Sequence, residues 1–168
     1  PSCQATSQPL TAIDATYRDF NADHPDFFRN LFDWHATIGL VEATLGPNSL
    51  PVCRSPTGNG TILMLADCSR FAEWFTDVPG VNVRYAASLA LSYDAATGMS
   101  LFRSESYFPM DGRGFNEVVY PFMHPGFETT HNYLFTSEYH VTFLYGGGEV
   151  FSFQGDDDVW VFIDSRLV

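Results

Sequence analysis

Alternation of apolar and polar side chains is clearest over Tyr133–Tyr145, and a triple glycine, Gly146–Gly148, follows it. Because successive side chains of a strand point to opposite faces, the stretch predicts a long β-strand that the glycines turn back. One face would carry Tyr139, Val141, Phe143 and Tyr145, and the other His140, Thr142 and Leu144. A shorter alternation over Thr11–Phe20 predicts a first strand.

Two further pairs of apolar runs predict hairpins. Leu89–Tyr93 and Met99–Ser104 flank the loop Asp94–Gly98, whose glycine suits a hairpin turn. Near the end of the chain, Val150–Phe153 and Val159–Ile163 flank one glycine and three consecutive aspartates. The last run is almost wholly apolar, which predicts a strand buried on both faces.

Helical spacing is limited to two short segments. Phe27–Leu31 fits one helical turn, and Asp67–Thr76 fits a short amphipathic helix that places its tryptophan in the core. The prolines and glycines of Pro47–Thr61 predict a long loop, and residues 1–10 predict an extended arm.

These elements together predict the fold class. Short strands separated by turns, with one small helix and long loops, indicate an antiparallel β-sandwich or barrel formed by residues 11–168 as a single domain. The pattern reaches Val168 without a closing turn, so we expect the sheet to be incomplete at its C-terminal end.

Charge narrows the classes of partner. The 168 residues have a formal charge of −12, and all eight basic residues are arginines. Such a field repels phosphate backbones and anionic lipid surfaces, which argues against nucleic acid and membrane-surface ligands. No apolar run approaches the roughly 18 residues of a membrane span. Cations, neutral ligands and other proteins remain as partners.

Cysteine and glycosylation patterns point to an extracellular location. Cys53 and Cys68 lie on either side of a loop-like segment, so a disulfide between them would close a short loop, which leaves Cys3 to pair outside this stretch. Asn59 begins an N-glycosylation acceptor triplet within the same segment. The first residues lack a signal-peptide pattern and fit an already processed chain.

The three adjacent carboxylates Asp156, Asp157 and Asp158 are the candidate metal site. A hard cation such as Ca²⁺ needs several oxygen ligands, which consecutive aspartates supply only where the backbone bends, for example at a cis peptide. The alternative is a solvated hairpin turn in which the aspartates cap backbone amides. Spacing alone leaves both interpretations open.

Several blocks of the sequence resemble the fibro-slime domain, which is related to the protective-antigen-type sugar-binding β-sandwich of adhesins. In chain order the blocks are Tyr17–Phe20, His24–Phe27, Trp74–Asn82, Phe108–Gly112, His131–Glu138 and Phe151–Asp164. The resemblance covers most of the chain from Ala12 onward, and its last block is the most specific.

The resemblance implies an extracellular domain of adhesins or matrix proteins. In the lectin branch of the wider superfamily a cis-linked pair of aspartates holds Ca²⁺, which binds sugar hydroxyls, and the pair would fall on Asp156 and Asp157. Asp158 stands where many relatives have a small residue. Asp164-Ser165 replaces the usual Asn-Gly or Asp-Gly turn, and the strands that complete the sandwich after Val168 are absent.

Two functions follow as expectations. The first is a Ca²⁺-dependent carbohydrate-binding module of a cell-surface or matrix glycoprotein. The second is a structural subunit of an extracellular fibre, a homo-oligomer or an assembly with neighbouring chains, joined through sheet edges. We expect no catalysis, because the glutamates suggest no pair across a cleft and the histidines are too scattered for zinc.

Overall fold

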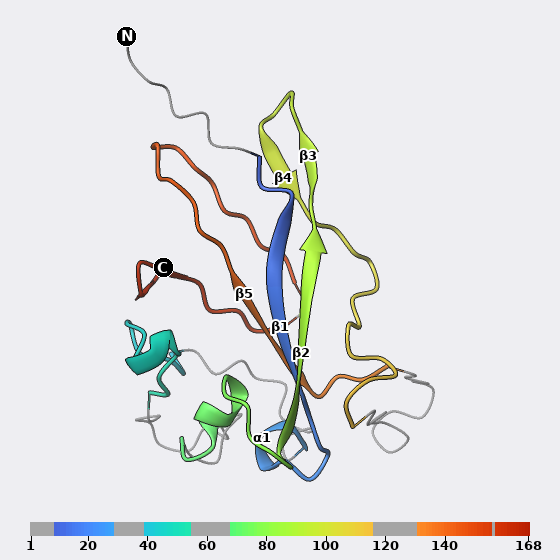
Figure 1. Cartoon of the computed structure of the whole chain (residues 1–168). Coiled ribbons are helices and arrows are strands. Elements are labelled where there is room, and N and C mark those ends of the chain that lie inside the picture. The colour runs from blue at the N-terminus through green and yellow to red at the C-terminus, as the bar shows by residue number, and fades with distance from the viewer. Residues whose placement is uncertain (1–8, 29–38, 55–67, 116–130, 156) are drawn as a thin grey trace.

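The structure of the chain is a computed structural model that describes residues 9–28, 39–54, 68–115, 131–155 and 157–168. Its centre is an antiparallel three-stranded sheet in which β1 (Ala12–Phe20) lies between β2 (Asn82–Ala90) and β5 (Phe135–His140), as Figure 1 shows. The predicted mainly β, antiparallel class is confirmed. The described strands form no closed barrel.

The remaining strands of the described residues form two small hairpins. They pair β3 (Ser92–Asp94) with β4 (Met99–Leu101) and β6 (Phe162–Ile163) with β7 (Arg166–Leu167). The first confirms the predicted hairpin loop, in which the Asp94 carboxylate accepts hydrogen bonds from the Ala96 N–H at 2.9 Å and the Thr97 hydroxyl at 2.9 Å. Gly98 closes this loop with a φ of 74°, which favours glycine.

The sequence prediction was right for β1 and wrong for β2. In β2, Asn82–Ala90, polar and small side chains interrupt the apolar pattern, so the segment was not predicted as a strand. It forms because every residue of β1 has a partner on it, with Tyr17 opposite Tyr85. The predicted strand Leu89–Tyr93 is instead divided at Leu91, whose N–H donates to the Thr11 carbonyl at 2.8 Å.

One face of the sheet is packed with aromatic side chains. Tyr17 and Met110 are buried there against Tyr85, Tyr107 and Phe135. The Tyr17 hydroxyl contacts that of Tyr107, which lies 2.9 Å from the hydroxyl of Tyr139 on β5. Burial raises the pKa of the Tyr17 phenol to about 12.

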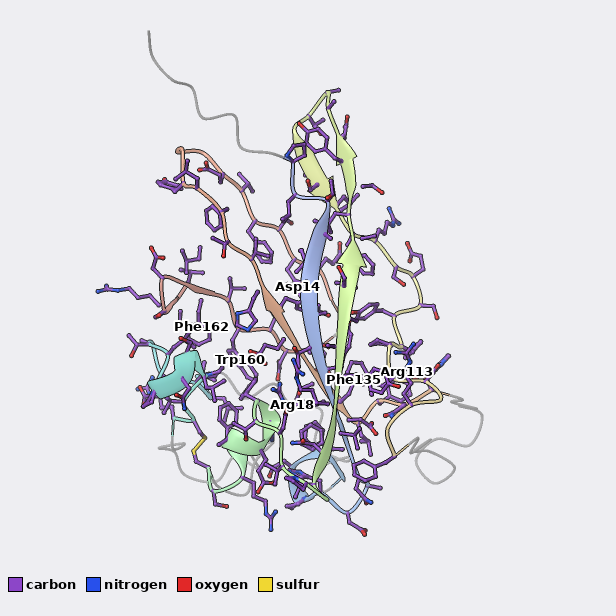
Figure 2. The ribbon with its side chains drawn as sticks, viewed as in Figure 1. Asp14, Arg18, Arg113, Phe135, Trp160 and Phe162 are labelled. Atoms are coloured by element: carbon purple, nitrogen blue, oxygen red, sulfur yellow. A yellow bond between two sulfur atoms is a disulfide. The ribbon has the colours of Figure 1, made fainter. Side chains whose placement is uncertain are left out.

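The opposite face carries a second core. Leu40, Val41, Phe71, Trp74 and Phe75 are buried together there, and Trp160, Phe162 and Leu167 pack against them, with Trp160 and Phe162 labelled in Figure 2. The Thr136 hydroxyl joins β5 to this layer through the Trp74 carbonyl at 2.8 Å. The predicted core role of Trp74 is confirmed.

Both predicted helical segments differ from the structure over the described residues. The segment Asp67–Thr76 forms only a four-residue 3-10 helix, η2 (Phe71–Trp74). The predicted turn Phe27–Leu31 begins earlier, as α1 (Pro25–Phe28), and its last three residues lie outside the described ranges. A further 3-10 turn, η1 (Pro47–Ser49), lies in the predicted loop.

Three predictions at the C-terminal end are wrong. The long strand Tyr133–Tyr145 is regular only over β5, and Val150–Phe153 has no strand structure. The run Val159–Ile163 is not buried on both faces, because Val159 and Ile163 are 48% and 42% exposed. Of this run, only its last two residues pair with another described strand, β7. An apolar run becomes a buried strand only where other elements cover it.

Candidate functional site

The acidic turn is exposed at the residues that the structure describes. Asp156 lies outside these residues, and the Asp157 carboxylate accepts a hydrogen bond from the Asp158 N–H at 2.8 Å. Desolvation, and then the charge of Asp157, raise the pKa of the Asp158 carboxyl. No three histidine, cysteine or acidic side chains of the described residues gather as metal ligands. The Ca²⁺ site at Asp156, Asp157 and Asp158 therefore stays a prediction.

The predicted disulfide is present. Cys53 and Cys68 are bonded with their Cα atoms 5.7 Å apart, across a sequence separation of 15 residues. Cys53 also forms a β-bridge with Val41 and packs against the core around Trp74. The disulfide thus joins the 39–54 segment to the start of η2. Asn59 and Cys3 lie outside the described residues, so their predicted glycan and external pairing stay predictions.

The most exposed apolar segment follows β5. Residues 141–155, here named the apolar extension, run away from β5 and return, in orange to red in Figure 1. They form no strand with other described residues. Its large side chains are exposed by 43–89%: Val141, Phe143, Leu144, Tyr145, Val150, Phe151 and Phe153. Exposed apolar surface of this kind marks an interaction site in soluble proteins.

The tip of the apolar extension has a defined local structure. The Glu149 carboxylate accepts hydrogen bonds from the N–H groups of Gly146 at 2.6 Å and Gly147 at 2.9 Å. These bonds, that from Gly146 first, hold the pKa of Glu149 below its usual value. Glu149 is the only charged residue between 141 and 155, in a chain of net charge −12. The acidic residues elsewhere in the chain make two molecules repel each other electrostatically. This repulsion is therefore weak at the extension.

A buried polar network lies where β1 ends. The Asp19 carboxylate is fully buried and accepts the Phe115 N–H at 2.5 Å and an amide N–H of Asn132 at 2.6 Å. The backbone N–H of Asn132 in turn donates to the Asp111 carboxylate at 2.7 Å, and His131 Nδ1 lies 2.6 Å from the same carboxylate. The network links the central strand to an exposed imidazole. Sequence reasoning gave these residues no role.

A second charged group joins the sheet to the η2 layer. Arg18, 7% exposed on β1, contacts Asp77 at 3.1 Å and Glu138 at 2.9 Å. Burial alone would raise the pKa of Glu138, but hydrogen bonds from His140 and Arg18 outweigh it and lower the pKa. Each of these charged side chains has a partner of opposite charge. The group therefore has a structural role, in which it links β1, β5 and the segment after η2.

His24 lies in the loop between β1 and α1 and is buried, at 4% exposed. Its Nδ1 accepts the Asp26 N–H at 3.2 Å, and its Nε2 lies 3.0 Å from the Glu73 carboxylate. Asp26 also accepts the indole N–H of Trp74 at 3.1 Å. The cluster fixes α1 against η2, which is a structural role.

Fold and site together define an antiparallel β-rich domain with one disulfide-closed loop and a large exposed apolar segment. The proteins to which the chain is similar include psiD, psiR and psiC of Dictyostelium discoideum. It is 41% identical to protein psiD over 92% of the chain, 37% to psiR over 98% and 36% to psiC over 96%.

The aligned regions are only parts of these relatives. The chain spans 31% of the length of psiD, 17% of psiR and 32% of psiC. No protein-family model matches the chain, and no solved structure matches it. No helix of the described residues could cross a membrane.

Proposed function

We propose that this chain is an extracellular, non-catalytic interaction domain of a fibre or matrix glycoprotein. It assembles with a neighbouring polypeptide through the apolar extension, residues 141–155, and the edge of β5 that no other described strand pairs with. The disulfide between Cys53 and Cys68 supports an oxidising location.

The exposure of the apolar extension carries this proposal. Phe143 is 52% exposed, Tyr145 74% and Phe151 67%, which are unusual values for such side chains on a soluble domain. Within the described residues β5 pairs only with β1, so its other edge offers backbone groups for pairing. An extended strand added at such an edge satisfies the backbone groups and covers the side chains together.

The chemistry of the extension selects its partner. The partner is an extended segment of another polypeptide, rich in β-branched and aromatic residues and poor in carboxylates. Glu149 is engaged at the tip by Gly146 and Gly147, so the flanks of the extension carry no charge that would need a counter-ion. The partner segment itself should carry few carboxylates, because the remainder of the chain is acidic. Residues 141–155 of a second copy, with the single carboxylate of Glu149, meet this condition.

Light scattering on the purified chain tests the proposal. We expect concentration-dependent assemblies for the wild-type chain and a monomer for the double variant Phe143→Asp/Phe151→Asp. The matched control Leu101→Asp, at a residue 56% exposed on the β3–β4 hairpin, should still assemble. Circular dichroism should be the same for all three. A wild-type monomer whose extension amides resist hydrogen exchange would contradict the proposal.

A Ca²⁺-dependent carbohydrate-binding module is the second candidate. The adjacency of the exposed carboxylates Asp157 and Asp158 supports it, because like charges held together favour a cation as a third partner. Carboxylate oxygens are suitable ligands for Ca²⁺, and Asp157 and Asp158 would supply them together with Asp156.

Calorimetry and a glycan array test this second candidate. Asp157→Ala should abolish both Ca²⁺ binding and glycan binding. The control Asp164→Asn changes an exposed carboxylate at a φ of 48°, which asparagine also tolerates, and should leave both unchanged. A glycan signal that persists in excess chelator would exclude the Ca²⁺-dependent mode.

A further inference from the structure

We infer that Phe108, His131 and Tyr133, with Asp111, form a binding platform for a neutral sugar that needs no metal ion. This aromatic platform shares no residue with the acidic turn or the apolar extension. Sugar binding at this platform therefore does not depend on either function proposed above.

The aromatic side chains of the platform are stacked on one another and partly exposed. The rings of Phe108 and His131 are stacked in parallel, with centroids 3.7 Å apart and planes inclined by 1°. Tyr133 stands edge-on to Phe108 at 5.4 Å. Tyr133 is 41% exposed, and the side chains of His131 and Asp111 are 34% and 37% exposed. The rings thus support one another while remaining accessible to a ligand.

The Asp111 carboxylate determines which ring nitrogen of His131 donates a hydrogen bond. Hydrogen bonds from the Asn132 backbone and from His131 hold the pKa of the Asp111 carboxyl below its ordinary value, so this group is an ionised acceptor at neutral pH. His131 Nδ1, 2.6 Å from this carboxylate, must then carry the proton. In the neutral ring Nε2 is consequently an acceptor, and it has no hydrogen-bond partner among the described residues.

A supporting chain of residues leads from the buried strand to this imidazole. Asn132 is 1% exposed and connects Asp19, through its side chain, to Asp111, through its backbone N–H. At Gly114, which has a φ of 60°, a Cβ atom would lie 2.1 Å from an Asp19 carboxylate oxygen. Only glycine lets this turn approach Asp19 so closely. A partly exposed histidine held through buried neighbours has the preorganisation that a binding site requires.

The chemistry of the platform selects a neutral sugar. The net charge of −12 opposes phosphates and other anions, and no three metal-ligating side chains of the described residues converge. A pyranose offers an apolar C–H face to the exposed rings and hydroxyl groups around its edge. One hydroxyl can donate to His131 Nε2, on the side of the ring away from the Asp111 carboxylate.

Saturation-transfer NMR with the whole chain tests the inference, with excess chelator present. The probes are methyl glycosides of glucose, galactose, mannose and N-acetylglucosamine. We expect transfer to at least one of them. His131→Phe keeps a stacked ring but removes Nε2, and should weaken that binding about five- to tenfold. Tyr133→Ala should weaken it, and the control Tyr93→Ala, at an exposed tyrosine on β3, should not.

Two results would overturn the inference. One is the absence of transfer to all four sugars, and the other is unchanged affinity in His131→Phe. Transfer that is seen only when the chelator is left out, and that is insensitive to His131→Phe, would assign the sugar to the acidic turn instead. Light scattering of His131→Phe should match the wild-type chain, which separates this site from assembly through the apolar extension.

Discussion

The end of the central sheet and the apolar extension are made of similar residues in opposite environments. Phe20, at the end of β1, is fully buried and stacks on Phe27 with centroids 4.1 Å apart. Phe143, three residues after β5, is 52% exposed. Both lie in sequences that predict strands. The difference is that β1 has a hydrogen-bonded neighbour on each side, and the extension has none among the described residues.

This contrast shows what an alternating pattern of apolar and polar residues can predict about a strand. An alternating sequence gives the two faces of a strand different chemistry, but it does not supply the neighbours that turn the pattern into burial. The first region is therefore a source of stability for the folded chain, and the second is surface that a partner can cover. Substitutions in the two regions should have opposite consequences for folding and for assembly.

The largest expected effect separates the two regions directly. Phe20→Ala should destabilise the chain by about 3–5 kcal/mol, because it removes a fully buried ring from the stack with Phe27. Phe143→Ala should change stability by less than about 0.5 kcal/mol, since little buried area is lost. Urea unfolding of both variants measures the difference. Equal losses would mean that the extension belongs to the folded core.

The disulfide should come next in size. Replacing Cys53 and Cys68 together by serine should cost about 3 kcal/mol, the value expected for opening a closed loop of about 15 residues. The urea midpoint of the double variant should equal that of the wild-type chain in reductant. A wild-type midpoint that does not respond to reductant would contradict the role given to this bond.

Glycine substitutions test the crowding around Asp19. Gly114→Ala should destabilise the chain by more than the roughly 1–2 kcal/mol of a left-handed backbone, because its Cβ would collide with the Asp19 carboxylate. Gly98→Ala is a matched control, with a φ of 74° and no atom within 4 Å of the added Cβ. The difference between their thermal midpoints isolates the contact with Asp19. Equal thermal midpoints for the two variants would show that the close approach to Asp19 does not affect the stability of the chain.

The smallest expected effect is a change in how the stability of the chain depends on pH under acidic conditions. The folded-state pKa of Asp111 lies below its unfolded value of 3.8. A lowered pKa contributes stability that is present above the unfolded pKa and is lost as the pH falls through the folded pKa. Asp111→Asn should therefore reduce stability slightly at neutral pH and flatten its decline below about pH 4. Parallel curves for the two proteins would show that Asp111 is not part of that decline.

Local signals explain which parts of the fold could be predicted. The β3–β4 hairpin depends on Asp94 and Gly98 within one short loop, and β1 on its own alternation. The pairing of Cys53 with Cys68 followed from their position around one loop-like segment. In each case the residues that decide the structure are close together in the sequence.

The remainder depends on contacts between distant residues. Asn132 meets Asp19 across 113 positions of sequence, and Arg18 meets Glu138 across 120. No local pattern encodes either pair, so the network that holds His131 could not be inferred. In the candidate metal turn, the three aspartates were found from their adjacency alone, and adjacency does not determine how their oxygens are directed.

The chain of tyrosine hydroxyls on the aromatic face gives the protein an internal optical indicator. Ordinary phenols ionise near pH 10, whereas burial raises the pKa of Tyr17 to about 12. The ultraviolet band of its phenolate should therefore appear late in an alkaline titration, and at an ordinary pH once β1 separates from β2 and β5. The part of the alkaline absorbance change that belongs to Tyr17 thus reports whether the central sheet is intact.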